Sequence, residues 1–231
     1  MNVFINQFFG IGDIIFCMTI ARRFIAQGYN VTWGTLPHFL DGLRRAYPDI
    51  TWVDYRKFKI DYDKKGEHDA IVRGEPYRVV PLRWNVEILG VPYSQCMASK
   101  YDLFGWHYKD WKEQAHFERG EKENELAELL GIDFSKPYTL TNRFFGSNSQ
   151  FCCQMGSEGI EMQSIEGYSL FDWATIIENA ECIHTANTSI LYLLELLDLK
   201  AKEVHLYCRK PQEKDFRNTE YLHTKNYILH Y

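Results

Sequence analysis

Two short polar segments of this 231-residue sequence carry residue types that could do chemistry. The first is Gly10-Ile11-Gly12-Asp13, which follows an apolar run and precedes apolar residues at helical spacing. Glycines at positions 10 and 12 let the backbone approach a ligand closely or adopt a positive φ. A carboxylate such as Asp13 suits proton acceptance from a hydroxyl group better than it suits a phosphate. We interpret Asp13 as a candidate general base; the alternative is that it only caps a helix.

The second segment is Thr185-Ala186-Asn187-Thr188-Ser189, which leads into a strongly apolar stretch. Hydroxyl groups, an amide and free backbone N–H groups at the start of a helix suit a phosphate or a diphosphate. We therefore take Asn187, Thr188 and Ser189 as candidate ligand-binding residues. The alternative is a helix that is simply well capped.

Both segments need elements that place each of them at the end of a strand. Apolar runs and helical periodicity predict strands at 2–9, 30–35 and 50–55 that alternate with helices at 14–25 and 38–47. They predict a second series with strands at 138–142, 182–184 and 204–207 and helices at 169–180 and 190–199. A charged helix at 111–130, either continuous or broken at Gly120, is expected between the two series. The sequence therefore predicts an α/β fold of two Rossmann-like halves, 1–134 and 135–231, that face a cleft.

The composition narrows the class of protein. The net charge is −5 without a long basic tract, which argues against nucleic-acid binding. No window approaches 18 consecutive apolar residues, so no membrane span is expected. The first residues lack the pattern of a secretory leader, and the six cysteines form no CxxC pair, so we expect a cytoplasmic protein without disulfides. The eight histidines show no HxxxH or HExxH spacing, so we expect no metal.

Other enzyme classes fit the motifs less well. The third glycine of a dinucleotide fingerprint would fall at Ile15, which argues against a nicotinamide or flavin cofactor, and we expect no cofactor. Asp61-Tyr62-Asp63 matches the letters of a metal-binding DxD motif but lies among lysines, so we interpret it as a solvated loop. A methyltransferase or phosphatase is disfavoured because Gly34-Thr35 ends the second strand without an acidic residue and Cys208-Arg209 lacks phosphate-loop spacing.

The order of these motifs resembles the ADP-heptose–LPS heptosyltransferase family, within the GT-B class of glycosyltransferases. That family opens with a strand, a G-x-G-D turn and a long apolar helix, as residues 4–24 do here. Its later half has a helix, a short strand, a D-[ST]-[GS] turn and an apolar helix. Residues 170–197 follow that order, with Asn187 in place of the acidic residue.

The resemblance implies a metal-independent transfer of a sugar from a nucleotide-diphosphate donor to an acceptor hydroxyl. It implies that Asp13 is the general base and that residues 187–189 hold the diphosphate. A basic residue after the first strand of the second half would neutralise the leaving group; Arg143 is the first candidate and Arg209 the second. The acidic residue that binds the ribose is either Glu166 or Asp172. The alternative function is a protein of the same fold that binds a nucleotide or a glycan without catalysis.

Overall fold

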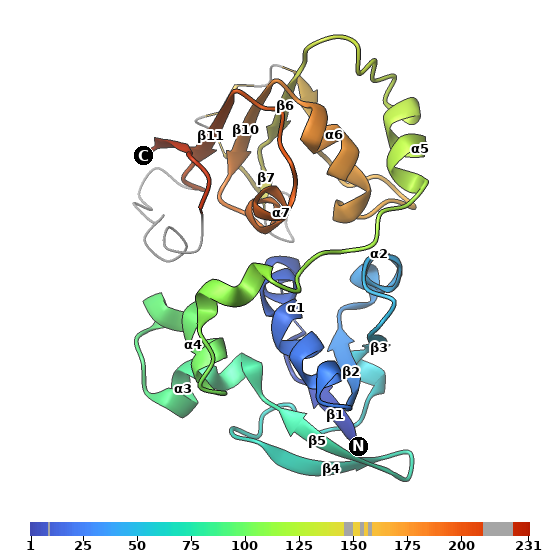
Figure 1. The fold of residues 1–231 in the computed structure, drawn as a ribbon, viewed down its shortest axis with the longest axis vertical. Coiled ribbons are helices and arrows are strands. Elements are labelled where there is room, and N and C mark those ends of the chain that lie inside the picture. The colour runs from blue at the N-terminus through green and yellow to red at the C-terminus, as the bar shows by residue number, and fades with distance from the viewer. Residues whose placement is uncertain (9, 146–149, 153–154, 157–158, 210–223) are drawn as a thin grey trace. The chain divides into compact units, whose positions relative to one another are not determined.

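The computed structural model describes residues 1–231 except residues 9, 146–149, 153–154, 157–158 and 210–223. The chain divides into two compact units, Met1–Glu118 (unit 1) and Arg119–Tyr231 (unit 2), which we describe separately (Figure 1). Each unit contains a five-stranded sheet in which parallel pairing dominates, together with helices. This architecture confirms the predicted α/β class.

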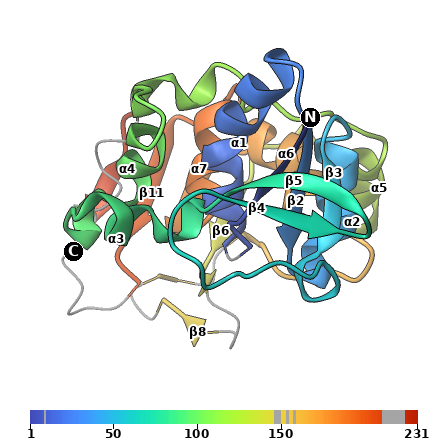
Figure 2. The ribbon, with the colours of Figure 1, turned by 90° about the horizontal axis from the view of Figure 1, so that it is seen from below.

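The sheet of unit 1 has the strand order β3-β2-β1-β5-β4. Four strands are parallel: β1 (Asn2–Ile5), β2 (Asn30–Thr35), β3 (Thr51–Asp54) and β5 (Glu75–Val80). The edge strand β4 (His68–Val72) runs antiparallel to β5, and the two form a hairpin (Figure 2). The strands predicted at 2–9, 30–35 and 50–55 are therefore present, the first in shorter form.

One long helix dominates unit 1. This helix, α1 (Ile11–Ala26), has ten buried residues, and the ring of Phe16 lies 5.2 Å from that of Tyr101 and 5.5 Å from that of Trp111. The Tyr101 hydroxyl also donates to the Phe16 carbonyl at 2.7 Å, which fastens a later segment to α1. The other helical elements of unit 1 are η1 (Pro37–Phe39), α2 (Leu40–Ala46), η2 (Tyr55–Lys57), η3 (Leu82–Trp84), α3 (Asn85–Leu89), η4 (Tyr93–Gln95), α4 (Cys96–Asp102) and η5 (Tyr108–Lys112).

The sheet of unit 2 is parallel throughout, with the order β12-β11-β10-β6-β9. Its strands are β6 (Thr139–Asn142), β9 (Ile160–Glu161), β10 (Cys182–Ala186), β11 (Glu203–Tyr207) and β12 (Ile228–His230). A short antiparallel pair, β7 (Phe144–Phe145) and β8 (Gln150–Phe151), follows β6. The helical elements are α5 (Lys122–Leu129), η6 (Leu170–Trp173), α6 (Ala174–Asn179) and α7 (Ile190–Leu196).

Local sequence explains where η6 begins. The Ser169 side chain accepts from the backbone of the first turn, while Asp172 Oδ2 accepts from the Ser169 N–H at 2.6 Å. This capping box satisfies amide groups that the helix itself leaves unpaired. The predicted helix start at Ser169 is confirmed.

Two predicted elements differ from the structure. The segment 111–130 contains two separate elements, η5 and α5, and between them the carbonyl groups of Gln114 and His116 accept from the Arg22 side chain instead of from helix amides. The turn expected at 185–189 is shorter, because Thr185 and Ala186 continue β10 in register with Leu206 and Tyr207.

The boundary between the units also lies elsewhere than residue 134. Arg119 donates to the carboxylates of Glu123 and Glu178, and Glu123 accepts from the backbone and hydroxyl of Thr175 at 3.0 and 2.6 Å. These contacts attach α5 to α6 and therefore to unit 2. Within the described part of the chain, no helix combines the length and the hydrophobicity that crossing a bilayer requires.

Candidate functional site

The candidate base lies at the point where the sheet of unit 1 changes direction. From β1 the chain passes through α1 to β2 on one side, and it later returns as β5 on the other side of β1. Open α/β sheets bind ligands in the crevice at such a point, outside the carboxyl ends of the strands. Asp13 is in the first turn of α1, directly after β1.

A buried lysine holds one oxygen of the Asp13 carboxylate. Lys100 Nζ lies 2.5 Å from Asp13 Oδ1 and 3.0 Å from Gln7 Oε1. The Lys100 side chain is only 2% exposed, whereas that of Asp13 is 33% exposed. Burial alone would lower the pKa of Lys100, but the adjacent Asp13 carboxylate, together with Cys17 and Cys96, outweighs burial and raises it, so the ammonium group keeps its charge at neutral pH. The carboxylate is thus oriented from the protein side and open from the solvent side.

Gly10 has the conformation for which glycine was expected. Its φ is +74°, and a Cβ atom at this position would lie 2.6 Å from Asp13 Oδ2. Gly12 is buried in the first turn of α1. Among the described residues, the hydrogen bond of the Asp13 carboxylate is to Lys100 and not to an amide of the helix. The alternative that Asp13 only caps α1 is therefore not supported.

Two buried polar atoms lie at the same edge of this sheet. Asn6 Oδ1, just after β1, and Thr35 Oγ1, at the end of β2, have no hydrogen-bond partner within the part of the chain that the structure describes. Both residues are fully buried. Buried polar atoms are nearly always paired in folded proteins, and His68 Nε2 and Asn85 Oδ1 share this feature elsewhere in unit 1, so it does not by itself mark a site.

Unit 2 contains a pocket of about 230 Å³ at the carboxyl ends of β6 and β9. Its wall combines the rings of Phe144, Tyr168 and Trp173 with the polar side chain of Asn142. The remaining lining residues are Met162, Gln163, Ser164, Ile165, Ser169 and Leu170. Typical ligand pockets have volumes of roughly 300–1,000 Å³. This one is therefore sized for part of a ligand, such as a planar ring.

The pocket is connected to the second predicted segment through Asn142. The Asn142 amide donates to Thr185 Oγ1 at 2.9 Å and to Thr188 Oγ1 at 3.1 Å. β6 lies between β9 and β10, so Asn142 is again where the connections of the sheet diverge. Asn187 uses its backbone N–H for the Tyr207 carbonyl at 3.0 Å, and Ser189 precedes α7 without a side-chain capping bond.

The structure pairs both candidate arginines. Arg143 Nε lies 2.6 Å from Glu161 Oε2, and both side chains are about one-fifth exposed. Arg209 donates through Nε to the carbonyl oxygen of Asn187. Arg143 lies beside the pocket because its neighbours in sequence, Asn142 and Phe144, line it.

The two acidic candidates for ribose binding do not line this pocket. Asp172 is 6% exposed and serves as the capping partner of Ser169, and Glu166 is an exposed residue before η6. Asp61 and Asp63 are exposed, as expected for a solvated loop, while Tyr62 packs its ring against Phe8 at 5.5 Å.

Sequence reasoning missed Lys100, Glu161 and the aromatic wall of the pocket. Lys100 lies in α4, and no local signal in the sequence distinguishes it from a surface lysine. Glu161 lies in a segment without clear periodicity. The alternation of Asn142 and Phe144 around Arg143 is the one local pattern that could have indicated the pocket, because residues two apart on an extended chain point to the same side.

Comparison with known proteins adds little to this description. Neither a protein-family model nor a curated protein sequence matches this chain. A glycosyl transferase family 9 structure from Veillonella parvula is 11% identical with a TM-score of 0.49, covering 89% of this chain and 80% of its own. The bacterial iron-containing dodecameric glycosyltransferase TibC from enterotoxigenic E. coli is 10% identical with a TM-score of 0.49, covering 90% of this chain and 57% of its own. At these values the similarity says nothing about the activity of this chain.

Proposed function

We propose that this protein is a glycosyltransferase that moves a sugar from a nucleotide-diphosphate donor to an acceptor hydroxyl group, with Asp13 as the general base. The observation that carries the proposal is the Asp13 carboxylate at the switch point of the unit 1 sheet. One of its oxygens is held by a buried ammonium group, and the side chain stays one-third exposed.

The chemistry requires a carboxylate of this kind. Asp13 accepts the proton of the acceptor hydroxyl while the hydroxyl oxygen forms a bond to the anomeric carbon of the donor sugar. The bond from that carbon to the diphosphate oxygen breaks, and the nucleoside diphosphate leaves with the electron pair. Lys100 is a positioning residue in this scheme, because it fixes the carboxylate without touching the substrate.

The donor side of the proposal uses the pocket of unit 2. The aromatic wall formed by Phe144, Tyr168 and Trp173 suits a nucleobase, which presents a flat apolar face. Asn187, Thr188 and Ser189 are proposed to contact the diphosphate, and Arg143 to neutralise the charge of the leaving group by exchanging Glu161 for phosphate oxygens. The mechanism as proposed needs no metal ion, since cationic side chains supply the positive charge.

The Arg143–Glu161 pair also favours a second candidate function. The Glu161 carboxylate, 2.6 Å from Arg143, already neutralises the charge of the arginine, which weakens its attraction for a phosphate. A protein that binds a nucleotide or glycan in the pocket and catalyses no transfer is consistent with that pairing.

A binding experiment followed by a turnover experiment separates the two functions. Thermal melting of the 231-residue chain is measured with UDP-, ADP- and GDP-sugars, and release of nucleoside diphosphate is then measured with the best donor and a panel of hydroxyl acceptors. Asp13→Asn should keep the donor-induced rise in Tm and lose about 10²–10⁴-fold in kcat, the usual contribution of a general base.

Asp63→Asn is the matched control, because Asp63 is an exposed aspartate of unit 1 outside the proposed site. It should leave both measurements unchanged. Donor binding without turnover in the wild type supports the second function. Failure of every nucleotide sugar to raise Tm refutes the transferase, and failure of free nucleotides and glycans as well refutes the second function.

A further inference from the structure

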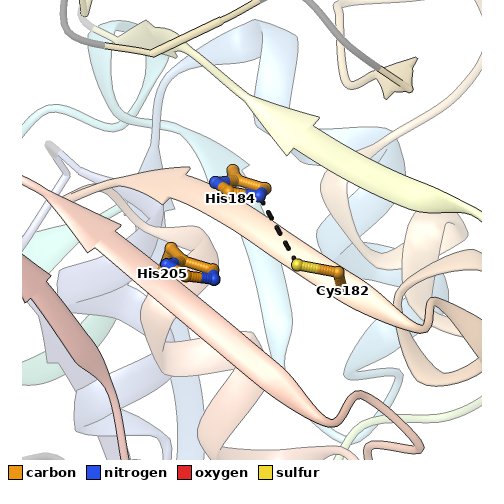
Figure 3. A group of neighbouring side chains, drawn as sticks. All are labelled: Cys182, His184 and His205. Carbon is orange, nitrogen blue, oxygen red and sulfur yellow. Dashed lines mark hydrogen bonds between the residues drawn. The ribbon is translucent and has the colours of Figure 1, made fainter.

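One face of the unit 2 sheet carries a cluster of metal-ligating side chains. Cys182 and His184 are two residues apart on β10 and therefore lie on the same face of the sheet. His184 is in register with His205 on the neighbouring strand β11, so His205 shares that face. The three side chains point toward one another (Figure 3). All three are half-buried.

The distances within this cluster suit a single small cation. Each residue offers one ligand atom, and these atoms lie within 4.8 Å of one another. Cys182 Sγ is 3.4 Å from His184 Nε2. Bonds of about 2.0–2.3 Å in tetrahedral geometry separate two zinc ligands by roughly 3.3–3.7 Å. The Cys182–His184 pair already has this separation. His205 stacks on His184 with ring centroids 4.4 Å apart and has to tilt inward by roughly 1 Å.

We propose that Cys182, His184 and His205 bind one divalent transition-metal ion, with zinc as the preferred ion. A thiolate together with two imidazoles is a ligand set that zinc favours, whereas calcium and magnesium prefer oxygen. The thiol loses its proton to solvent when the sulfur–metal bond forms. This inference does not depend on the proposed transfer reaction.

The second nitrogen of each histidine already has a partner. His184 Nδ1 lies 3.0 Å from the Tyr207 hydroxyl, and His205 Nδ1 lies 3.0 Å from His230 Nε2. Metal-ligating histidines usually donate their other ring N–H to such an acceptor, which fixes the ring and the tautomer. Binding through both Nε2 atoms therefore leaves each Nδ1–H with an acceptor in place.

A carboxylate adjoins the cluster at His205 and, after a side-chain rotation toward the metal, would serve as the fourth ligand. Glu203 is in register with Cys182, and its Oε2 lies 3.1 Å from His205 Nε2. Because Glu203 is at the Cys182 end of the cluster, the Nε2 atom of His205 also faces that end. Three ligands from β10 and β11 plus this carboxylate would complete a tetrahedral site that connects the two strands.

Cobalt is the probe for the test, because Co²⁺ bound to a thiolate gives a charge-transfer band that reports the sulfur directly. The metal-stripped 231-residue chain is titrated with Co²⁺, and Zn²⁺ is then added as competitor. The proposal expects one Co²⁺ per chain, a thiolate band, and displacement by zinc. Isothermal titration measures the zinc affinity.

Variants identify the ligands. Cys182→Ser should abolish the thiolate band. His205→Gln should lower zinc affinity by at least about tenfold, since loss of even an outer-shell partner costs about 10–100-fold. The matched controls are Cys96→Ser and His68→Gln, which change half-buried residues of the same types in unit 1 and should leave metal binding unchanged.

Circular dichroism checks that each variant is folded. If Cys182→Ser does not fold, the zinc affinity of His205→Gln and the thiolate band in the cobalt spectrum of the wild type together test the site. A spectrum without a thiolate band in the wild type refutes the site. So does a thiolate band that persists in Cys182→Ser, or a zinc affinity that His205→Gln leaves unchanged.

Discussion

Replacement of Asp13 by asparagine should destabilise unit 1 more than replacement of its partner Lys100 by methionine. The reason is the unequal exposure of the two side chains, 33% for Asp13 and 2% for Lys100. Asp13→Asn leaves a buried ammonium group without its counter-charge, which costs about 3–5 kcal/mol. Lys100→Met leaves a carboxylate that water can reach, so we expect the smaller loss of about 1–2 kcal/mol, part of it from the hydrogen bond between Lys100 and Gln7 Oε1.

The double variant makes the reasoning quantitative. With Asp13→Asn and Lys100→Met combined, no charge is buried, and the free energy of unfolding should return to within about 1 kcal/mol of the Lys100→Met value. Additive losses in this cycle, or a larger loss for Lys100→Met than for Asp13→Asn, would refute the account. Tryptophan fluorescence during urea denaturation is the assay, because Trp173 is the one tryptophan of unit 2 and the other five belong to unit 1.

The free energy of unfolding should change with pH in opposite directions in the wild type and in Asp13→Asn. In the wild type the Asp13 carboxylate outweighs burial and raises the pKa of Lys100 above its ordinary value of 10.5. The stability that comes from the raised lysine pKa is therefore fully present at neutral pH and is lost as the pH rises above 10.5. In Asp13→Asn burial acts without that carboxylate and lowers the pKa of the lysine, so stability should increase with pH. The double variant lacks the Asp13 carboxylate but should remain folded, so its activity reports the loss of the base alone.

Two further predictions concern the packing of each unit. Burial raises the pKa of Glu123, but hydrogen bonds from Arg119 and Thr175 outweigh it and lower the pKa overall, so this carboxylate stabilises unit 2 at neutral pH and less as the pH falls through its acidic range. Glu123→Gln should lower the free energy of unfolding by about 1–3 kcal/mol at pH 7. Urea titrations should also show that this variant loses less stability than the wild type between neutral and acidic pH. If the free energy of unfolding depends on pH as steeply as in the wild type, Glu123 does not have this role. Gly10→Ala should lower Tm more than Gly28→Ala, because both glycines have positive φ but only at Gly10 does the new Cβ meet Asp13 Oδ2, at 2.6 Å. Equal effects of the two substitutions would show that the carboxylate moves aside freely.

The elements of the fold could largely be predicted from the sequence, because their signals are local. The strand at 30–35 matches the predicted bounds, and the helix start at Ser169 follows from its capping residues. For the charged segment 111–130 the sequence left open whether one helix continues or breaks at Gly120, because charge alone does not reveal that Arg119 and Glu123 bond to residues more than fifty positions later.

The candidate site was only half predictable for the same reason. Asp13 and Gly10 are recognisable because strand, turn and helix follow directly in the sequence. Lys100 comes from a different helix, and its contact with Asp13 depends on the packing of α4 against α1. The cluster of Cys182, His184 and His205 was missed because the search used helical spacings, whereas the structure builds it across two parallel strands.

The link between Asp13 and Lys100 spans 87 positions of the chain. Losing the carboxylate first would leave the ammonium group buried without its counter-charge, whereas losing the lysine first costs less, so we expect evolution to have replaced Lys100 before Asp13. In natural relatives of this chain, a neutral residue at position 13 should be accompanied by a neutral residue at position 100. Lineages that abandoned the carboxylate would then be recognisable by the apolar side chain that fills the former lysine position.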